Sequence, residues 1–472
     1  MTLGNLTEGT QPSKGRRRSK EPIGGKMIET SDSEVVSTKT ERIAKLAKQA
    51  PEMVIKTLAH HMDMSWLREA YRRTRKRGAT GVDGQTAEAY AQDLERSLAA
   101  LLERAKSGSY RAPPVRRVHI PKGDGQSRPL GIPTFEDKVL QRAVAMLIEA
   151  VYEQDFLDCS YGFRPGRNAH QALATLRDTL MEMGGGWLIE VDIRNYFGSI
   201  DHQHLREALG QRIGDGVVLR LIGKWLNAGV MEEGQLSYPD SGTPQGGVIS
   251  PILANVYLHV VLDTWFEREV KPRLGGNAKL VRFADDFVIA LEREDDARRV
   301  YDVLPKRFGK YGLELHSEKT RLVPFKKPPW SKDDDGTSDG IERAVFELLG
   351  FKLFWARSQR GYWAIKLETS TSRFTRTLHR LSEWCRKNRH RPVAEQWERL
   401  RRALVGHYNY FGVTGNRGRL MAMRHELYGI WRNWLNRRSQ RARMTWAKMR
   451  LLHQRYKLPL PPPKSELRSL RS

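Results

Sequence analysis

Two adjacent carboxylates, Asp285 and Asp286, stand inside an apolar stretch with the sequence LVRFADDFVIAL. Apolar residues alternate on both sides of the pair, which predicts a β-hairpin with two carboxylates at its tip. Hairpin turns of two residues favour Asn-Gly or Asp-Gly, so a structural turn does not explain the pair well. Neighbouring buried carboxylates repel unless a cation offsets them. On this segment alone, a metal site and a plain turn both remain open.

A second segment supplies a third carboxylate. In WLIEVDIRNYFGSID an apolar strand at 188–191 delivers Asp192 at its end, 93 residues before Asp285. Carboxylates from two such strand ends can hold two Mg²⁺ ions about 3.5–4 Å apart, which activate a 3′ hydroxyl and stabilise a pyrophosphate leaving group. The combination favours nucleotidyl transfer. Asp201 precedes a helix start and is expected to cap that helix instead.

The charge of the chain points to a polyanionic partner. Its 472 residues carry 81 Lys and Arg against 55 Asp and Glu, a formal charge of +26. Residues 371–472 hold 25 Lys and Arg against 5 Asp and Glu, so +20 of that charge lies in this last section. Arg predominates there, which favours bidentate phosphate binding over a solvated charged helix face.

Cysteine content and hydropathy restrict the class of protein. Cys159 and Cys385 are the only cysteines in the sequence, and neither has partners at metal-ligand spacing, so no disulfide scaffold or zinc finger is expected. The first thirty residues lack the apolar core of a secretory signal. The most apolar window, 247–266, is interrupted by Pro251 and polar residues, so no membrane span is expected. We expect a soluble, cytoplasmic protein.

The elements that must position the carboxylates alternate along the chain. Residues 115–370 mix short β-branched runs with amphipathic stretches at 136–153 and 297–311, which predicts an α/β centre. Apolar positions before 102 and after 371 recur at helical spacing, and those after 371 predict an all-helical domain. Composition predicts disorder over the first forty residues and an end to folded structure at LPLPPPKSE. The pair Asp295-Asp296 is assigned to solvent.

A series of motifs then identifies a family. RPLGIPTFEDKVLQ, SYGFRPGRNAHQAL, EVDIRNYFGSIDH, GTPQGGVISPILANVYL, RFADDFVI, GLELHSEKT and LLGF resemble the conserved blocks of reverse transcriptases in order and rough spacing. They are most similar to bacterial group II intron-encoded reverse transcriptases and maturases. LVGHYNYFGVTGN, LYGIWRNWLNRRSQ and Trp446 resemble the maturase or thumb domain of that family. Many relatives continue into an endonuclease that this sequence lacks, so a form without that domain is expected.

The resemblance implies a right-hand polymerase, α/β with an α+β palm. We expect a disordered tail at 1–40, a helical extension of the fingers at 41–105, fingers and palm at 106–370, a helical RNA-binding thumb or maturase domain at 371–455, and a Pro-rich basic tail at 456–472.

The resemblance also assigns roles to individual residues. Asp192, Asp285 and Asp286 match the catalytic carboxylates, with the carbonyl of Ile193 as a further ligand for two Mg²⁺ ions that Mn²⁺ could replace. The dNTP-binding residues that it implies are Lys122, Arg128, Ile193, Phe197, Gln245 and Gly246. Among them, Lys122 and Arg128 match contacts to the triphosphate, and Phe197 matches the steric gate against a ribose 2′ hydroxyl.

Three further residues complete the assignment. Lys319 lies where the family has a basic residue near the departing pyrophosphate, and is a candidate general acid. Arg437 and Arg438 are predicted to bind RNA. The box Phe-Ala-Asp-Asp departs from most relatives, which have Tyr first; the metals should be kept, whereas fidelity or stacking could differ.

The expected partners are intron RNA, an RNA template, a DNA primer or target, the RNA–DNA heteroduplex and dNTPs, with no membrane. The protein would copy RNA into DNA, assist splicing as a maturase and support retromobility, in association with the nucleoid or a ribonucleoprotein. Two alternatives stay open: a non-catalytic splicing maturase, and a domesticated reverse transcriptase in DNA repair or phage defence.

Overall fold

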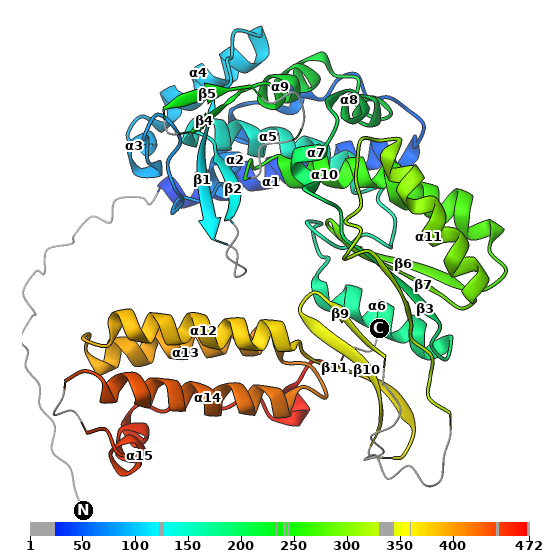
Figure 1. Ribbon diagram of the computed structural model, residues 1–472. Helices are drawn as coiled ribbons and strands as arrows, with labels where there is room; N and C mark the ends of the chain where they lie inside the picture. Colours follow the sequence, from blue (N-terminus) through cyan, green and yellow to red (C-terminus); the bar gives the residue numbers. More distant parts are fainter. Residues whose placement is uncertain are drawn as a thin grey trace, which may run out of the picture.

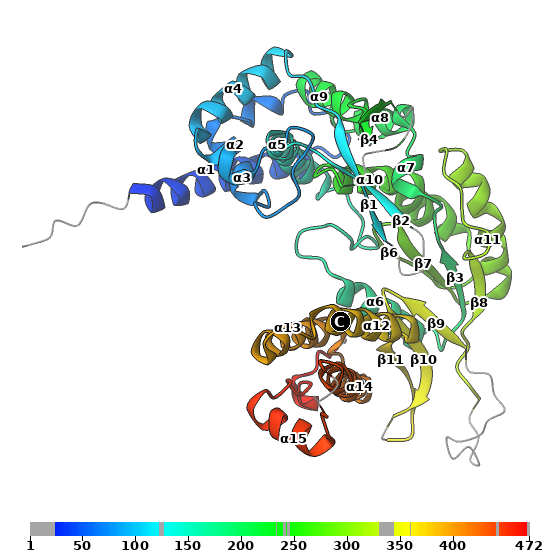
Figure 2. The ribbon, with the colours of Figure 1, turned by 60° about the vertical axis from the view of Figure 1, so that its left-hand side comes forward.

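The computed structural model describes residues 24–121, 127–232, 234–238, 242, 246–329, 344–358, 360–439 and 443–469. In the view of Figure 1 the chain is arranged like a reversed letter C that opens to the left. A mixed helical and stranded part forms the upper arm, β-strands form the closed side, and a layer of long helices forms the lower arm. Figures 1 and 2 agree that the hairpin of β1 and β2 points from the upper arm toward the helical layer.

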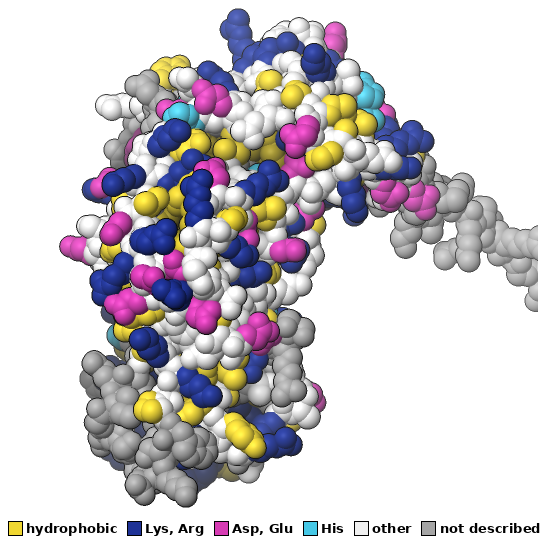
Figure 3. Space-filling view, turned by 90° about the vertical axis from the view of Figure 1, so that its right-hand side faces the viewer, with side chains coloured by type: hydrophobic (Ala, Val, Ile, Leu, Met, Phe, Trp, Pro, Cys, Tyr) yellow, Lys and Arg dark blue, Asp and Glu magenta, His cyan; other side chains and the backbone are white. Residues whose placement is uncertain are grey.

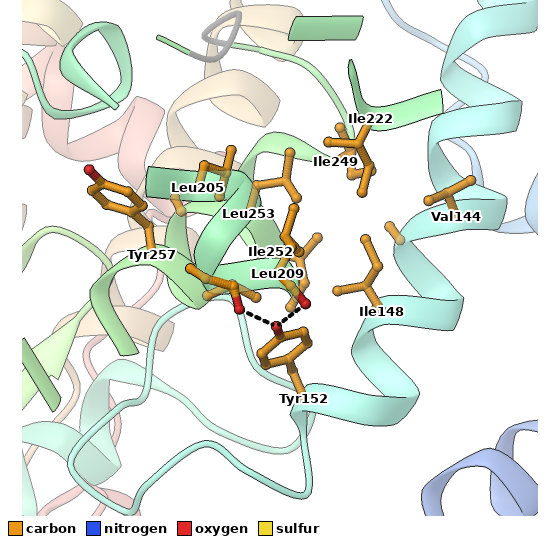
Figure 4. Packing of buried hydrophobic residues seen from close by; sticks show 14 of the residues in the cluster. Val144, Ile148, Tyr152, Leu205, Leu209, Ile222, Ile249, Ile252, Leu253 and Tyr257 are labelled. Carbon is orange, nitrogen blue, oxygen red and sulfur yellow. Dashed lines mark hydrogen bonds between the residues drawn. The ribbon is translucent and has the colours of Figure 1, made fainter. Parts of the chain in front are cut away.

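The upper arm is built around α5, a helix that is buried along most of its length. Thr134 caps its first turn by accepting a hydrogen bond from the N–H of Asp137. Figure 4 shows Val144, Ile148 and Tyr152 of α5 packed with Leu209 and Ile252. The helices of this arm are α1 (Gly24–Gln49), η1 (Ala59–His61), α2 (Met64–Arg73), α3 (Ala87–Ala91), α4 (Leu94–Ser107), α5 (Phe135–Tyr152), α8 (His202–Gly210) and α9 (Gly216–Leu226).

The prediction of disorder over residues 1–40 is wrong from Gly24 onward, because α1 begins there; residues 1–23 lie outside the described part. Val36, Ile43 and Ala47 of α1 are fully or almost fully buried in the core that α2 and α5 share. Few apolar residues at helical spacing are enough when a preformed surface receives them, since packing supplies most helix stability.

Three sheets carry the chain from the upper arm to the helical layer. Their strand orders are β2-β1-β4-β5, β6-β7-β3-β8 and β11-β10-β9. The strands are β1 (Val115–Pro121), β2 (Ser127–Ile132), β3 (Trp187–Val191), β4 (Val230–Glu232), β5 (Gln235–Ser237), β6 (Ala278–Phe283), β7 (Asp286–Leu291), β8 (Arg321–Pro324), β9 (Val345–Leu348), β10 (Phe351–Arg357) and β11 (Trp363–Thr369).

Helices cover the central sheet of β6, β7, β3 and β8. This palm part contains α6 (Ala169–Glu182), α7 (Tyr196–Ser199), α10 (Ser250–Leu258) and α11 (Glu294–Gly309). After α10 the chain forms two π-helical turns, η2 (His259–Asp263) and η3 (Phe266–Val270), and the short η4 (Lys271–Arg273). Asp296 in α11 is buried and accepts hydrogen bonds from the N–H groups of Gly275 and Gly276, so its assignment to solvent is wrong. Asp295 is exposed and pairs with Arg293.

The all-helical domain predicted after residue 371 is present. Its apolar positions form a core in which Leu381, Cys385, Leu427, Trp431 and Leu435 are buried. Its helices are α12 (Thr371–Asn388), α13 (Val393–Phe411), α14 (Arg417–Asn436), α15 (Trp446–Arg455) and the single turn η5 (Lys464–Glu466).

The prediction that folded structure ends at LPLPPPKSE is wrong. Leu458 and Leu467 are buried against the helical core, and Val413 forms a β-bridge with Arg468. A proline-rich segment cannot join a helix, but it can lie extended over one. None of the helices in the described ranges has the length and apolar composition that crossing a membrane requires.

Candidate active site

The predicted acidic hairpin is confirmed. β6 and β7 are antiparallel, and Phe283 pairs with Asp286, which leaves Ala284 and Asp285 as the two turn residues. Ala284 has a φ of 59°, a left-handed conformation that two-residue hairpin turns need and that glycine adopts more easily. Asp285 therefore lies in the turn itself, and Asp286 is the first residue of β7.

The third carboxylate lies beside this hairpin because β3 is the neighbour of β7. Val191 pairs with Phe287, so Asp192, one residue beyond the end of β3, comes next to Asp286. The carbonyl of Asp192 accepts a hydrogen bond from the N–H of His316 at 2.8 Å. Asp201, by contrast, caps α8 by accepting from the N–H of His204, as predicted. The fold thus brings together the three carboxylates that the sequence analysis selected.

The environment makes these carboxylates hard to ionise together. Burial raises the pKa of Asp285, and the charge of Asp192 adds to this, while Arg128 acts in the opposite direction. Burial raises the pKa of Asp286 to about 6, with further contributions from Asp285 and Asp192. The Asp286 side chain still reaches solvent at the mouth of a pocket. A cation at this position would relieve the repulsion.

Asp192 and Asp286 line that pocket, which has a volume of about 350 Å³. We call it the acidic pocket, since five carboxylates and two cations line it: Glu190, Asp192, Asp286, Glu318, Glu347, Lys319 and Arg321. Lys319 is largely exposed, and its Nζ lies 3.0 Å from Oδ2 of Asp192. The candidate general acid is therefore in direct contact with a candidate catalytic carboxylate.

The donor atoms present suit Mg²⁺, which prefers carboxylate and carbonyl oxygens. Ile193 forms an isolated bridge with Leu315 that uses the carbonyl of Asp192 and the N–H of Arg194, so this bridge leaves the carbonyl of Ile193 unused. No three His, Cys, Asp or Glu side chains in the described ranges are already grouped as a metal site.

A buried arginine, Arg282, supports the β6–β7 hairpin from the protein interior. Arg282 and Asp263 are both fully buried, with Nε to Oδ1 at 2.7 Å and Nη2 to Oδ2 at 2.5 Å. Arg282 also donates to Oδ1 of Asn255 at 2.9 Å and to the carbonyl of Ala284 in the turn at 3.1 Å. Asp263 belongs to η2, so a π-helical turn of the palm is tied to the turn that carries Asp285.

Gly162 completes this support. A Cβ atom at Gly162 would lie 2.3 Å from the backbone nitrogen of Ala284, so any side chain there would displace the turn. Sequence reasoning included Gly162 in a motif but missed the arginine network. A single Arg within the apolar run KLVRFA, with one Asp in the most apolar window of the chain, was the signal available for it.

The residues predicted to bind dNTPs come from several elements. Arg128, on β2, is exposed and lies close enough to Asp285 to lower its pKa. Phe197 is half-buried and its ring centroid lies 5.4 Å from that of Tyr196. Gly246 has a φ of 110° and a Cβ there would meet the carbonyl oxygen of Gly131 at 2.7 Å, so its close approach is to β2. Lys122 and Gln245 lie outside the described residues.

The helical layer brings a basic groove to the same region. A groove of about 420 Å³ between α12 and α13 is lined by Arg373, Arg376, Arg380 and Arg402. Arg373 lies close enough to Asp286 to lower its pKa. Sequence reasoning missed these residues, although the Arg spacing of three and four along α12 places them on one helix face.

Arg437 and Arg438, the residues predicted to bind RNA, lie at the end of α14 instead. The guanidinium of Arg437 lies 5.2 Å from the ring centroid of Trp434. Arg438 donates hydrogen bonds to the carbonyls of His390 and Arg391, so it also ties α14 to the loop before α13.

Comparisons with known proteins identify the family of this chain. Residues 120–353 match the family model described as reverse transcriptase (RNA-dependent DNA polymerase). The chain is 38% identical over 367 residues to Protein YkfC of Escherichia coli (strain K12), a match that covers 69% of this chain and 90% of that protein.

Several relatives have names that refer to introns, and two of them illustrate the range of similarity. Group II intron-encoded protein LtrA of Lactococcus lactis subsp. cremoris is 37% identical over 308 residues, which is 52% of this chain and 50% of LtrA. Nuclear intron maturase 1, mitochondrial, of Arabidopsis thaliana is 28% identical over 124 residues, which is 25% of this chain and 17% of that protein. Together with the acidic hairpin and the ordered motifs, these matches show that the chain belongs to the reverse transcriptase family, among the relatives of group II intron-encoded reverse transcriptases and maturases.

Proposed function

We propose that this protein is an RNA-directed DNA polymerase that also binds intron RNA as a maturase. The observation that carries the proposal is the convergence of Asp192, Asp285 and Asp286 at adjoining ends of β3 and the β6–β7 hairpin, in a chain of the reverse transcriptase family. RNA template, DNA primer, their heteroduplex and dNTPs are the partners that this reaction requires.

In the proposed reaction, the 3′ hydroxyl oxygen of a primer attacks the α-phosphorus of a dNTP. A new phosphodiester bond forms while the bond to pyrophosphate breaks, and the hydroxyl proton leaves to solvent. Two Mg²⁺ ions, or Mn²⁺ in their place, would neutralise charge on the attacking and leaving oxygens when bound by Asp192, Asp285, Asp286 and the Ile193 carbonyl. The like charges of these carboxylates, and the raised pKa values of Asp285 and Asp286, are the repulsion that a bound cation would relieve.

The surrounding residues have separate tasks. Arg128, together with Lys122, binds the triphosphate and balances its charge. The ring of Phe197 excludes a ribose 2′ hydroxyl, and Gln245 and Gly246 line the nucleotide site. Lys319 donates a proton to the departing pyrophosphate, for which its ammonium group at the edge of the acidic pocket is well placed.

The basic groove between α12 and α13 supports the proposed path of the nucleic acid. Its arginines lead from α12 toward Asp286, so a heteroduplex whose primer end lies at the carboxylates would pass along them. Arginine binds phosphates of either strand without reading bases, so the groove suits a template of any sequence. The same helical domain is proposed to bind intron RNA during splicing and retromobility.

Primer extension tests the polymerase proposal. The unaltered protein, Asp285→Ala and Asp295→Ala are each given an RNA template, a DNA primer, dNTPs and Mg²⁺. Asp295 is the matched control because it is an exposed carboxylate on α11. We expect product from the unaltered protein and Asp295→Ala, and a loss of at least about a thousandfold in Asp285→Ala, equivalent to about 4 kcal/mol of transition-state stabilisation.

Equal product from all three proteins would refute the proposed carboxylate site. Absence of product from all three, with RNA binding retained, would replace the polymerase by a non-catalytic maturase.

A further inference from the structure

A second pocket, of about 870 Å³, lies where three separate segments meet. We call it the basic pocket and define it by Arg360 and Tyr362 of the β10–β11 connection, Lys366 of β11, Arg417 of α14 and Lys464 of the C-terminal segment. None of the residues assigned to catalysis or nucleotide binding lines it. The order of the chain places these three segments up to 104 residues apart, so the pocket is a product of the fold.

The charge of this pocket has one sign. Four cations line it, and no Asp or Glu does so among the described residues. None of the four forms an ion pair within the described ranges, and Nε of Arg417 is buried without a hydrogen-bond acceptor. Cations gathered around a partly apolar cavity repel one another, and a bound anion would remove that repulsion.

An aromatic ring completes the lining. In β11 the side chains of Trp363, Ile365 and Leu367 are buried, so Tyr362 and Lys366 lie on the opposite face of the strand. Tyr362 is 69% exposed, which is unusual for a large ring. The N–H of Ser358 donates to the carbonyl of Tyr362 at 2.8 Å, and the N–H of Tyr362 donates to Oγ of Ser358 at 3.2 Å. The backbone under the exposed ring is therefore held in place.

The start of α14 adds to the preference for an anion. Arg417 is its first residue, and its first turn has no acidic residue. Helix N-termini favour negative charge, so a cation there is unfavourable unless an anion accompanies it. The side chain of Asn416 does not cap the helix, because it bonds to Thr369 and to the carbonyl of Phe411.

The basic pocket is separate from the acidic pocket. Leu348 and Leu349, at one end of the β9–β11 sheet, line the acidic pocket, whereas Tyr362 is at the other end. β10 separates Leu349 from Tyr362 by seven residues, Phe351–Arg357, which is about 20 Å at a rise of about 3.3 Å per residue, and Lys366 lies partway along it, opposite Phe354. A ligand in the basic pocket would not occupy the position of the primer terminus.

We propose that the basic pocket binds a single-stranded segment of RNA. One base stacks on Tyr362, and the adjoining phosphates bind Arg360, Arg417 and Lys464. Clustered cations, without ion pairs in the described ranges and beside an exposed aromatic ring, match a chain that alternates phosphates with flat bases. Proteins recognise RNA mainly at loops and single strands, whose unstacked bases can enter such a cavity. This inference rests on the proposed function only in taking RNA as a partner.

The experiment measures binding while the polymerase site is occupied. The full chain is first saturated with an unlabelled RNA–DNA hairpin whose primer end fills the catalytic site. A labelled oligouridylate of about 12 nucleotides is then titrated in, and its fluorescence anisotropy is followed at several salt concentrations. The variants are Tyr362→Ala and the pair Arg360→Ala with Lys464→Ala.

A pair of exposed lysines serves as the control. Lys306→Ala with Lys310→Ala removes two exposed cations, one in the last turn of α11 and one at its C-cap. Figure 3 shows basic and acidic side chains intermixed on the side of the molecule that it views. Primer extension on the hairpin is measured for every variant. Retained extension shows that the variant is folded, and it separates failure of this proposal from failure of the polymerase proposal.

We expect Tyr362→Ala to weaken oligouridylate binding about tenfold, the equivalent of losing about 1.4 kcal/mol of stacking. The double-alanine pair should lower the salt slope by about 1.4, or about 0.7 for each phosphate contact to a single strand. The Lys306 and Lys310 pair should change neither quantity.

Unchanged binding in both basic-pocket variants would overturn the proposal. So would complete displacement of the oligouridylate by the hairpin, since binding would then be at the catalytic site. Tighter binding of an oligoglutamate than of oligouridylate, lost in the same variants, would assign the pocket to an acidic peptide instead.

Discussion

The sheet of β9, β10 and β11 contributes to two pockets of opposite charge. The acidic pocket, next to the β9–β10 turn, has five carboxylates and two cations, and the basic pocket, along β11, has four cations and no carboxylate among the described residues. The charge of the acidic pocket favours binding of cations, and the charge of the basic pocket favours binding of an anion. Since one sheet connects the two pockets, an RNA segment bound in the basic pocket would be held at a set distance from the catalytic carboxylates.

The two pockets also differ in what supports them. Behind the acidic hairpin, Arg282, which forms a buried ion pair with Asp263, donates a hydrogen bond to the carbonyl of Ala284. In the basic pocket, Arg417 has no ion-pair partner among the described residues and is half-buried. Catalytic geometry tolerates small displacements poorly, whereas phosphate contacts tolerate more. The comparison predicts different responses to loss of an arginine.

The largest expected effect comes from Arg282→Met. It should lower the free energy of unfolding by about 3–5 kcal/mol, because Asp263 would be left as an uncompensated buried charge. Arg417→Met in the basic pocket should change it by less than about 1 kcal/mol. Urea unfolding measures both.

The double variant Arg282→Met with Asp263→Leu separates stability from positioning. Removing both charges should recover stability, yet primer extension should remain slow because Ala284 has lost its tie. Full recovery of kcat in this double variant would show that the pair does not position the turn.

Lys319→Met should have a smaller effect, and the extension rate and the Mg²⁺ requirement should respond differently. Extension should slow about tenfold to a hundredfold if Lys319 donates a proton to pyrophosphate. The Mg²⁺ concentration for half-maximal rate should fall, because Lys319 no longer competes for Asp192. Lys319→Arg keeps the positive charge. It should restore the competition with Mg²⁺ for Asp192 more fully than it restores the rate of primer extension. A Mg²⁺ requirement that rises in Lys319→Met would contradict this account of the acidic pocket.

The stabilisation of the protein by bound Mg²⁺ should differ severalfold between acidic and neutral pH. The folded pKa of Asp286 is about 6, above its ordinary value of 3.8, so the folded state binds more protons between these values. Asp286 therefore stabilises the metal-free protein most at low pH. Its contribution to the free energy of unfolding falls as pH rises through 6. Mg²⁺ should raise the melting temperature more at about pH 7.5 than at about pH 5.

Thermal denaturation with and without Mg²⁺ at the two pH values measures this difference. Asp286→Asn is the matched variant, and its response to Mg²⁺ should depend less on pH. An equal response of the unaltered protein at both pH values would mean that Asp286 does not bind the ion.

The smallest effect is expected for Arg437→Ala with Arg438→Ala. RNA affinity and its salt slope should both fall, but by less than for the basic-pocket pair, because Arg438 already bonds to two carbonyls. Salt-dependent anisotropy measures the slope, and urea unfolding reports the lost ties to the loop before α13. An unchanged slope would remove both residues from the RNA-binding surface.

Local patterns predicted much of the fold and the centre of the site. Alternating apolar residues around Asp285 and Asp286 were enough for the hairpin, and the position of Asp201 before a helix was enough for its cap. Both follow from contacts between residues close in sequence. The strand end at Asp192 was predicted in the same way, and the family motifs identified it as part of the same site.

Contacts between distant segments could not be predicted in this way. α1 is weakly apolar, and only the surface of α2 and α5 accounts for its folding. The tie between Arg282 and Asp263 joins β6 to η2, and the basic pocket gathers three segments. Asp296 looked like a surface residue until the fold placed Gly275 and Gly276 beside it.

The π-helical turn η2 limits how the length of this chain can vary. A π turn has one residue more than an α turn, and here Asp263 lies at its end, facing Arg282. Deleting one residue between Asn255 and Asp263 would rotate the aspartate by about 100° around the helix and remove it from the arginine. Apolar substitutions in this segment should be tolerated, whereas insertions and deletions of single residues should abolish polymerase activity from a position outside the catalytic pocket.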